Sequence, residues 1–247
     1  MLEKKVAIVT GASRGLGRAI AEKFAVNGAN LVLVALHEDG LRNVADVISQ
    51  LGGSASILAG DIAIPETSQL AFQMALDNHG GVDILVNNVG TISREPVEEL
   101  SVDSWQRVID ANLNGTFHMS RAVLPYMREQ ARGKIINMSS QMAKIPHPSA
   151  APSYEVSKSG VVALTRHLAY HYARFNICVN AIAPGSIDTD LPKSMTPAQR
   201  QKLKDAVPMR RLGDPEEVAD CAFFLASTMS DYLTGEVIDI NGGTVMD

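Results

Sequence analysis

Short runs of apolar residues recur along the chain, and each is followed by a turn and then by a stretch with helical spacing of apolar positions. Strands that are apolar at nearly every position are typical of a parallel sheet covered by helices on both faces. The alternation therefore predicts a three-layer α/β fold with a doubly wound parallel sheet of about seven strands. The runs cover residues 6–10, 31–36, 56–59, 84–86, 134–138, 177–182 and 236–240.

Helical patterns fill most of the intervals between these runs. The longest begins at Ser101 and runs toward Met127, with a kink expected at Pro125. No repeat, linker or low-complexity tract marks a boundary, so residues 1–247 are predicted to form a single domain. The other helices are expected from the first glycine turn to about 27, over 41–51, from 65 to about 80, around Tyr154, and over 215–226.

Composition narrows the classes of function. Hydrophobic residues make up 46% of the chain and charged residues 20%, as is typical of a globular protein. The net charge is -5 and the sequence contains no basic cluster, which argues against a nucleic-acid partner. The apolar runs are too short for a membrane span and no signal-peptide pattern is present, so we expect a cytoplasmic protein without a membrane partner. Cys178 and Cys221 form no C-x-x-C motif and are expected to be buried thiols.

A glycine turn joins the first apolar run to the first helix. Gly11, Gly15 and Gly17 have the spacing G-x-x-x-G-x-G, and such a turn can present backbone N–H groups and a helix N-terminus to a pyrophosphate. A plain tight turn would also explain the glycines, but their place in an alternating β/α chain favours a dinucleotide. Asp61 and Asn88 follow two other runs, at the sheet edge where ligands bind in such folds.

The end of the second run bears on which dinucleotide binds. A carboxylate there would hold the free ribose hydroxyl of NAD, and residues 35–37 offer none. Arg14 can reach a 2′-phosphate, whereas Glu38 and Asp39 follow closely; His37 could assist or be an ordinary surface residue. We therefore predict that NADP(H) is preferred and that NAD(H) is possible.

Tyr154 and Lys158 are four residues apart, which places them one turn above the other on a helix. An ammonium held there favours the phenolate and can lower the tyrosine pKa from about 10, as a proton donor requires. An isolated pair of this kind is more often an ordinary solvated helix face, so the neighbouring motifs decide its meaning.

Taken together, these motifs resemble the short-chain dehydrogenase/reductase family, in its compact single-domain branch with a Rossmann-type sheet. The resemblance spans essentially the whole chain, and residues 211–219 and 233–235 are closest to 3-oxoacyl-carrier-protein reductases and related sugar-alcohol dehydrogenases. The matching motifs are T-G-x-x-x-G-x-G at residues 10–17, N-N-A-G at 87–90 with Val89 in place of alanine, the helical Asn112, the upstream Ser140, Y-x-x-x-K at 154–158, and P-G-x-x-x-T at 184–189.

The resemblance implies a hydride transfer between a nicotinamide cofactor and a carbonyl or alcohol. Tyr154 would donate the proton, Ser140 would hydrogen-bond the same oxygen, Lys158 would lower the tyrosine pKa and hold the nicotinamide ribose, and Asn112 would position a relay water. Its implied cofactor contacts are Gly11, Ser13, Arg14, Gly15, Leu16, Gly17, Asp61, Ile62, Asn88, Gly90, Tyr154, Lys158, Pro184, Gly185, Ile187 and Thr189.

The loop before Tyr154 departs from the family pattern. Ser140 lies 14 residues before Tyr154, one more than we expect, so the loop carrying His147 is predicted to bulge. Ser139 competes with Ser140 for the role of catalytic serine, and we prefer Ser140 because it lies just past the strand end. His147 could touch substrate, although a solvated loop histidine is the more ordinary reading.

The substrate stays open at this stage. A 3-oxoacyl thioester leads, a polyol, sugar acid or steroid is the alternative, and a non-catalytic dinucleotide-binding regulator is the outside alternative. Residues 186 to about 207 are expected to form a lid, with Leu191 and Met195, and Met142 outside it, lining the substrate side or simply packing. The family commonly forms homotetramers, so a homotetramer or homodimer is expected, with His167 and His171 at the interface or surface rather than on a metal.

Overall fold

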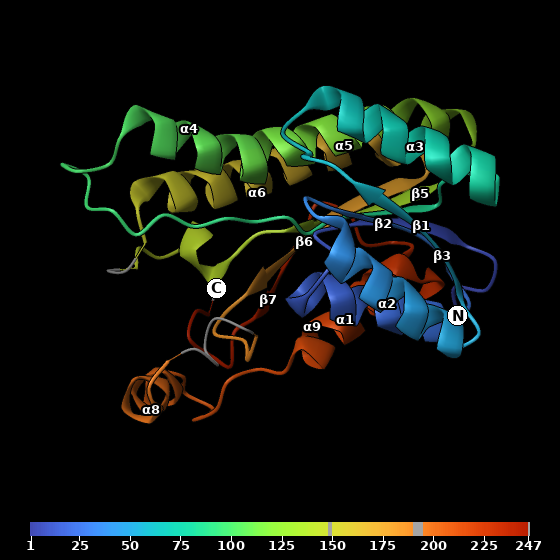
Figure 1. Cartoon of the computed structure of the whole chain (residues 1–247). Coiled ribbons are helices and arrows are strands. Elements are labelled where there is room, and N and C mark those ends of the chain that lie inside the picture. Colours follow the sequence, from blue (N-terminus) through green and yellow to red (C-terminus); the bar gives the residue numbers. More distant parts are fainter. Residues whose placement is uncertain (148–149, 190–194, 247) are drawn as a thin grey trace.

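The computed structural model describes residues 1–147, 150–189 and 195–246 as a three-layer α/β fold (Figure 1). A single sheet of seven parallel strands lies in the middle, in the order β3-β2-β1-β4-β5-β6-β7. The order reverses between β1 and β4, as the doubly wound prediction requires, and the predicted fold class is confirmed. The strands are β1 (Val6–Thr10), β2 (Asn30–Ala35), β3 (Ser54–Ala59), β4 (Ile84–Asn87), β5 (Gly133–Met138), β6 (Ile177–Pro184) and β7 (Val237–Ile240).

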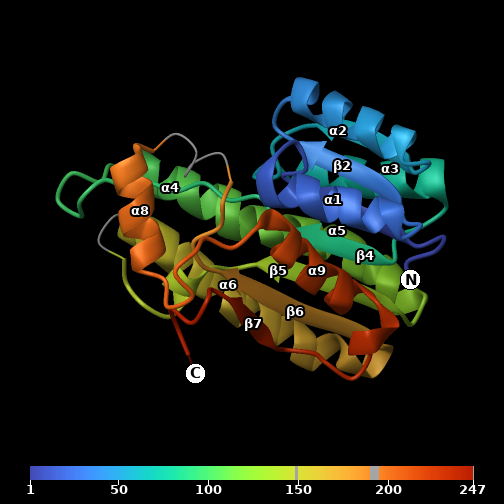
Figure 2. The same ribbon diagram turned by 90° about the horizontal axis from the view of Figure 1, so that it is seen from below.

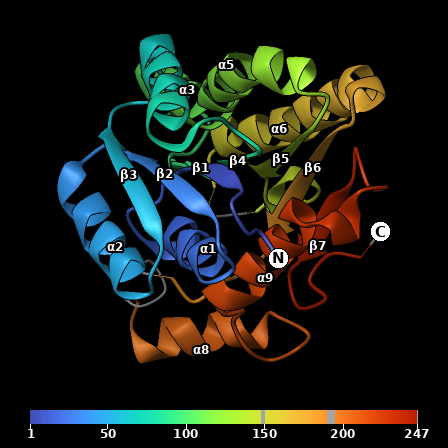
Figure 3. The ribbon, with the colours of Figure 1, turned by 90° about the vertical axis from the view of Figure 1, so that its right-hand side faces the viewer.

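Helices cover both faces of the sheet (Figures 1 and 3). The helices α1, α2 and α9 bury their apolar sides on one face, and α3, α5 and α6 bury theirs on the other. The sheet therefore separates two apolar cores. The helical bounds are α1 (Gly15–Val26), α2 (Glu38–Gln50), α3 (Pro65–His79), α4 (Val102–Ile109), η1 (Asp110–Asn114), α5 (Gly115–Glu129), η2 (Gln141–Ala143), α6 (Pro152–Tyr172), η3 (Ala173–Phe175), α8 (Pro197–Asp205), α9 (Pro215–Ala226) and η4 (Thr228–Ser230).

The central strands are apolar because they are covered on both sides. All residues of β1 and of β6 are buried, whereas the edge strands β3 and β7 are mostly half-buried. The registers place the carboxyl ends of β1, β4 and β5 next to one another, so the residues that follow these strands meet at one edge of the sheet.

The long helix expected from Ser101 is interrupted. Regular α4 gives way to the π-helical turn η1 around Asn112, and α5 continues beyond Pro125 to Glu129. A π turn inserts an extra residue, which the spacing of apolar residues does not reveal, and such turns are frequent at functional sites.

The helix α8 lies apart from the two cores. None of its residues is buried, and it lies at the same end of the molecule as α4 in both Figure 1 and Figure 2. The lid predicted over residues 186 to about 207 includes α8. Of the two apolar residues expected in it, Leu191 lies outside the described residues and Met195 is half-buried just before α8. No helix in the described ranges is long and apolar enough to cross a membrane.

Candidate functional site

The glycine turn is held in place by the end of β4. The Thr10 hydroxyl accepts hydrogen bonds from the backbone N–H groups of Asn88, at 2.9 Å, and of Val89, at 3.3 Å. In return, the Asn88 side-chain amide donates to the carbonyl oxygens of Thr10, at 3.0 Å, and of Gly11, at 3.3 Å. Asn88 therefore fixes the path of the glycine turn with its side chain, a structural function that the sequence reasoning did not anticipate.

Two glycines of the turn are required by space. A Cβ atom on Gly17 would lie 2.2 Å from the Gly11 carbonyl oxygen, and Gly11 itself has a φ of +64° with a would-be Cβ 2.8 Å from the Asn88 amide nitrogen. Arg14 is the N-cap residue of α1, but its side chain makes no capping hydrogen bond, and the first turn of the helix contains no acidic residue. Uncapped N–H groups at a helix N-terminus, with an arginine beside them, fit the pyrophosphate of a dinucleotide.

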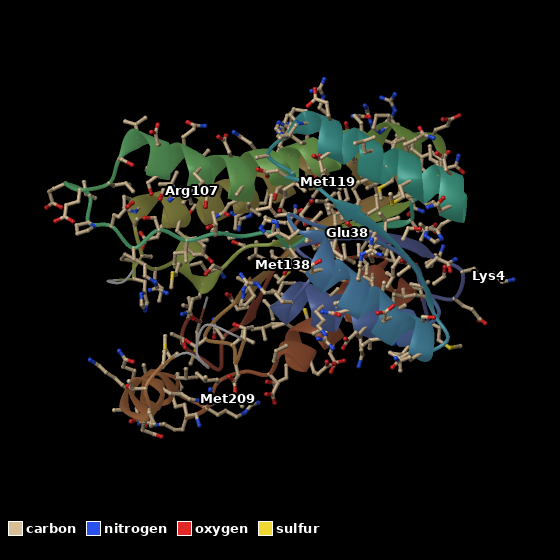
Figure 4. The ribbon with its side chains drawn as sticks, viewed as in Figure 1. Lys4, Glu38, Arg107, Met119, Met138 and Met209 are labelled. Atoms are coloured by element: carbon tan, nitrogen blue, oxygen red, sulfur yellow. The ribbon has the colours of Figure 1, made fainter. Side chains whose placement is uncertain are left out.

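The start of α2 lies against the same turn. A Cβ on Gly40 would come within 2.8 Å of the Ser13 Cβ, so α2 approaches the turn closely. Arg14 is exposed here, and Leu36, at the end of β2, is 59% exposed. Glu38, labelled in Figure 4, is exposed at the N-terminus of α2 and pairs with Arg42 at 2.5 Å.

Gly90, Asn112 and Lys158 meet beyond the end of β4. A Cβ on Gly90 would lie 3.2 Å from the Lys158 Nζ and 3.9 Å from the Asn112 Oδ1. Glycine at position 90 thus leaves room for the lysine ammonium and for the asparagine amide in one place.

The Asn112 side chain is fully buried and makes three hydrogen bonds. Its Oδ1 accepts from the Thr91 N–H at 2.8 Å, and its Nδ2 donates to the Thr91 carbonyl and to the Ser157 hydroxyl, both at 2.9 Å. Ser157 donates in turn to the Tyr154 carbonyl at 2.7 Å. The π turn therefore ties the β4 loop to the helix that carries Tyr154 and Lys158.

The two candidate serines have different partners. The Ser139 hydroxyl donates to the main-chain oxygen of Lys158 at 3.0 Å, which occupies it in holding α6. The Ser140 hydroxyl caps η2 by accepting from the Met142 N–H at 3.1 Å, and it lies close enough to Tyr154 to act to lower the pKa of the phenol. This geometry favours Ser140 over Ser139 as the partner of the tyrosine.

Lys158 and Tyr154 differ in how burial affects them. The Lys158 Nζ donates to the Met138 carbonyl oxygen at 2.8 Å, and burial lowers its pKa to about 8. Burial also raises the pKa of Tyr154, and the hydrogen bond from Ser140 acts in the opposite direction. Desolvation is therefore the larger influence on the Tyr154 pKa here, and the Lys158 Nζ lies 5.9 Å from the ring centroid.

The segment after β6 completes this edge of the sheet. Gly185 donates its N–H to the Ile240 carbonyl at 2.8 Å, and Ile187 forms an isolated parallel bridge with Gly213. The would-be Cβ of Gly15 lies 3.7 Å from the Thr189 Cγ2, so this segment reaches the glycine turn. The structure thus brings the segment beginning at Pro184 to the N-terminus of α1.

The two candidate cofactor residues that follow β3, Asp61 and Ile62, differ in their exposure. Asp61 is exposed and accepts from the Ala63 N–H at 2.9 Å. Ile62 is 3% exposed and packs where a Cβ on Gly115 would come within 2.7 Å of its side chain. Any contact of Ile62 with a cofactor would therefore involve its backbone.

A buried polar ladder beneath the site was missed by the sequence reasoning. The Asn87 amide donates to the Asn137 Oδ1 and the Asn137 amide to the Thr165 hydroxyl, each at 2.9 Å. Both asparagines are at most 2% exposed. The available signal was a polar residue within two otherwise apolar strands, since a buried amide requires partners.

Three other candidates lie outside this group. The His147 backbone N–H donates to the Glu155 carboxylate at 2.7 Å, which anchors the loop before α6. The His167 and His171 rings lie with centroids 4.4 Å apart and are tilted by 47°, and no group of three metal-binding side chains occurs in the described part of the chain.

A surface pocket outside this group is also remote from the site. Its volume is about 730 Å³, and it lies near the amino ends of β5 and β6, away from the carboxyl ends where the candidate residues gather. It is lined by Phe72, Pro125, Tyr126, Arg128, Glu129 and Phe175.

Known proteins match the whole chain. A family model described as Enoyl-(Acyl carrier protein) reductase matches residues 11–245. A 3-oxoacyl-[acyl-carrier-protein] reductase of Vibrio cholerae is 38% identical over 99% of both chains. A 3beta-hydroxysteroid dehydrogenase of Eggerthella lenta is 39% identical over 99% of this chain and 95% of its own.

A solved structure agrees with these relatives. A 3-oxoacyl-[acyl-carrier protein] reductase of Brucella melitensis, with bound NAD, has a TM-score of 0.91 and 36% identity over 99% of this chain and 92% of its own. The family model, the relatives and the solved structure all point to the family that the sequence motifs resemble. The chain therefore belongs to the short-chain dehydrogenase/reductase family of NAD(P)-dependent oxidoreductases.

Proposed function

We propose that this protein interconverts a ketone and a secondary alcohol, and that a 3-oxoacyl thioester is its ketone substrate. The observation that carries the proposal is the convergence of Gly90, Asn112 and Lys158 beyond the end of β4, with the Lys158 Nζ 2.8 Å from the Met138 carbonyl oxygen and 5.9 Å from the Tyr154 ring centroid. Ser140 lies beside the same tyrosine, and the glycine turn is at the same sheet edge. The Ser140 and Tyr154 hydroxyl groups, this close to each other, can both reach one substrate oxygen. That arrangement suits a carbonyl on which negative charge develops.

Tyr154 is the proposed proton donor. Because burial raises its pKa, the phenol keeps its proton at neutral pH and can transfer it to the developing alkoxide. Ser140 donates a hydrogen bond to the same oxygen and keeps it oriented toward the phenol. Asn112, held by Thr91 and Ser157, is proposed to position the water that returns a proton toward Lys158.

The cofactor-binding residues are proposed on the fit described above. The bound nicotinamide supplies the hydride, and the chain supplies placement and charge. The glycine turn would hold the pyrophosphate, Lys158 the nicotinamide ribose, and the segment from Pro184 to Thr189 the carboxamide. Asn88 would act chiefly by fixing the turn, and Asp61 and Ile62 would border the adenine side.

We propose that NADP(H) is preferred over NAD(H). Arg14 is exposed in the glycine turn, and its neighbour Ser13 lies against Gly40 at the start of α2, where a 2′-phosphate would lie. Glu38 would oppose a phosphate, but its carboxylate is paired with Arg42. The Brucella melitensis relative was solved with NAD, so both coenzymes belong in the test.

A panel of carbonyl substrates tests the proposal. Purified protein is assayed with NADPH and with NADH against 3-oxoacyl-carrier protein, a short 3-oxoacyl thioester, a keto sugar acid and a 3-ketosteroid. We expect the highest kcat/KM for the thioesters. A steroid is the second candidate, because the steroid dehydrogenase relative is as similar as the acyl reductase. Coenzyme binding without turnover of any ketone would instead support a non-catalytic regulator.

We further propose a cytoplasmic homotetramer or homodimer. Apolar side chains are exposed on the outer helices. They include Phe117 on α5 at 45% and Tyr170 on α6 at 83%, and Tyr170 lies on the same helix as the neighbouring His167 and His171 rings. Such a surface suits a second copy of the chain. Analytical ultracentrifugation gives the test, since a monomer at micromolar concentration would contradict the assembly.

A further inference from the structure

The helix α8 makes few attachments to the rest of the fold. None of its residues is buried, and its N-terminus is closed by its own capping box of Thr196 and Gln199. Behind its C-terminus, Val207 is 4% exposed and the Met209 N–H donates to the Gly242 carbonyl at 3.2 Å. Met209 is labelled beside α8 in Figure 4. This end of α8 is therefore anchored, whereas its other turns rest on the surface.

One side chain of α8 crosses to the cofactor segment. The Arg200 guanidinium pairs with the Asp188 carboxylate, and their side chains are 29% and 24% exposed. Among the described residues, the other side-chain hydrogen bonds of α8 stay within residues 196–210. The pair is thus the described polar link between α8 and the segment after β6.

Asp188 lies at a position where such a link has consequences. It stands between Ile187 and Thr189, two proposed cofactor contacts, and its N–H donates to the Gly213 carbonyl at 2.8 Å. Asp188 and Thr189 line a pocket of about 280 Å³ together with Gly15 of the glycine turn. A force on the Asp188 carboxylate therefore acts on the wall of the proposed cofactor site.

The charged residues around this pocket give the Arg200–Asp188 ion pair a second effect. Besides Asp188, the pocket is lined by Arg14, Arg18 and Glu22, and Arg18 is paired with Glu22 at 2.7 Å. Without the guanidinium, the Asp188 carboxylate would leave an unpaired negative charge in the wall of this pocket, which also contains Gly15 of the turn proposed to hold the pyrophosphate. Like charges there would repel, and partial burial would limit screening by solvent.

We infer that Arg200 is a positioning residue that holds α8 against the cofactor-binding segment through Asp188 and thereby slows release of the bound coenzyme. The inference rests on the proposed function, because it assumes that residues 184–189 contact the coenzyme. Arg200 itself touches neither coenzyme nor substrate in this account. Its effect passes through the ion pair, so it depends on Asp188.

A double-mutant cycle on the full chain tests the inference. NADPH release is measured by stopped-flow displacement, using nucleotide fluorescence, for the wild type, Arg200→Gln, Asp188→Asn, the double variant and Arg200→Lys. We expect roughly tenfold faster release for Arg200→Gln, because loss of a largely shielded pair acts mainly on dissociation and leaves the Asp188 carboxylate unpaired. Asp188→Asn also frees α8 but removes that carboxylate, so its release should be faster than the wild type by a smaller factor. The double variant should release no faster than Arg200→Gln, and Arg200→Lys should stay nearer the wild type.

Lys202→Gln is the matched control, since Lys202 is an exposed cation on the same helix. The NADPH release rate of Lys202→Gln should stay within about twofold of the wild-type rate. All variants should have the same unfolding midpoint as Lys202→Gln. Equal release from Arg200→Gln and Lys202→Gln would overturn the inference, as would a double variant whose effect is the product of the two singles. Failure of the wild type to bind either coenzyme would instead contradict the proposed function.

Discussion

The ammonium of Lys158 donates a hydrogen bond to the main-chain oxygen of Met138 over 2.8 Å, and the lysine is only 3% exposed. The contact joins the middle of the fold, at the end of β5, to the helix that carries Tyr154. Burial opposes the charge and lowers the lysine pKa to about 8. A buried cation of this kind costs stability, so its presence points to a functional requirement.

Replacement of Lys158 by methionine should separate stability from activity. Lys158→Met removes a buried charge and keeps the aliphatic length, so the free energy of unfolding at pH 7 should be unchanged or higher by on the order of 1–3 kcal/mol. Ketone reduction should fall by at least about a hundredfold. Urea unfolding and steady-state assays measure the two effects, and a variant that is both active and less stable would refute this view of the lysine.

The same lysine gives a pH signature of stability. Between pH 8 and about 10 the unfolded chain holds a proton on this lysine, whose usual pKa is 10.5, while the folded chain has released it. The contribution of Lys158 to stability therefore rises with pH across this range. Above pH 10 the raised pKa of Tyr154 acts in the opposite direction. Lys158→Met should lack the rise, and an identical pH dependence in both proteins would argue against a lowered lysine pKa.

The two serines should differ in what their removal affects. Ser140→Ala deletes the hydroxyl that bonds to Tyr154 and should lower kcat about a hundredfold or more, with little change in stability. Ser139→Ala deletes a buried bond to the Lys158 backbone and should cost about 1–2 kcal/mol of unfolding free energy. Parallel kinetics and denaturant unfolding decide the assignment. A Ser139 variant with the larger loss of kcat at equal stability would reverse it.

Gly17 should be intolerant of a methyl group. In Gly17→Ala the new carbon would meet the Gly11 carbonyl oxygen at 2.2 Å, so the glycine turn must shift and coenzyme affinity should fall by at least about tenfold. Gly52→Ala is the control, since its φ is +80° but nothing lies within 4 Å of a Cβ there. That variant should lose only about 1 kcal/mol of stability and no affinity. Titration with NADPH distinguishes them, and normal binding by Gly17→Ala would contradict the proposed cradle.

Arg14 should set the coenzyme preference. In Arg14→Gln the KM for NADPH should rise by about tenfold, because a charged bond to the 2′-phosphate is lost, while the KM for NADH should change little. Arg42→Gln should also raise the KM for NADPH, because it removes the cation paired with the Glu38 carboxylate, which would then repel the 2′-phosphate. Equal effects of Arg14→Gln on both coenzymes would remove the basis for a preference for NADP(H).

The strands and the order of motifs could be predicted because their signals are local. The run from Val6 to Thr10 and the glycines after it predicted a strand, a turn and a helix, which the structure shows as β1 and α1. The pattern of burial predicts the two covered faces of the sheet but not how one side chain meets another. Sequence spacing therefore placed Asn112 on a helix without revealing the π turn around it.

The remaining features depend on contacts between distant parts of the chain. Asn88 bonds to the glycine turn across 78 positions, and Asn112 to Ser157 across 45. The direction of the Tyr154 pKa shift depends on burial, which a four-residue spacing cannot give. Polar residues inside apolar strands, as at Asn137, were the one local sign that such partners exist.

The most direct test of the proposed chemistry is the rate of ketone reduction by Tyr154→Phe. Tyr170→Phe is the matched control, because it removes a phenol from the same helix at a residue that is 83% exposed. Tyr154→Phe should reduce 3-oxoacyl thioester at least about a hundredfold more slowly and bind NADPH normally, whereas Tyr170→Phe should match the wild type. Normal turnover by Tyr154→Phe would contradict the account.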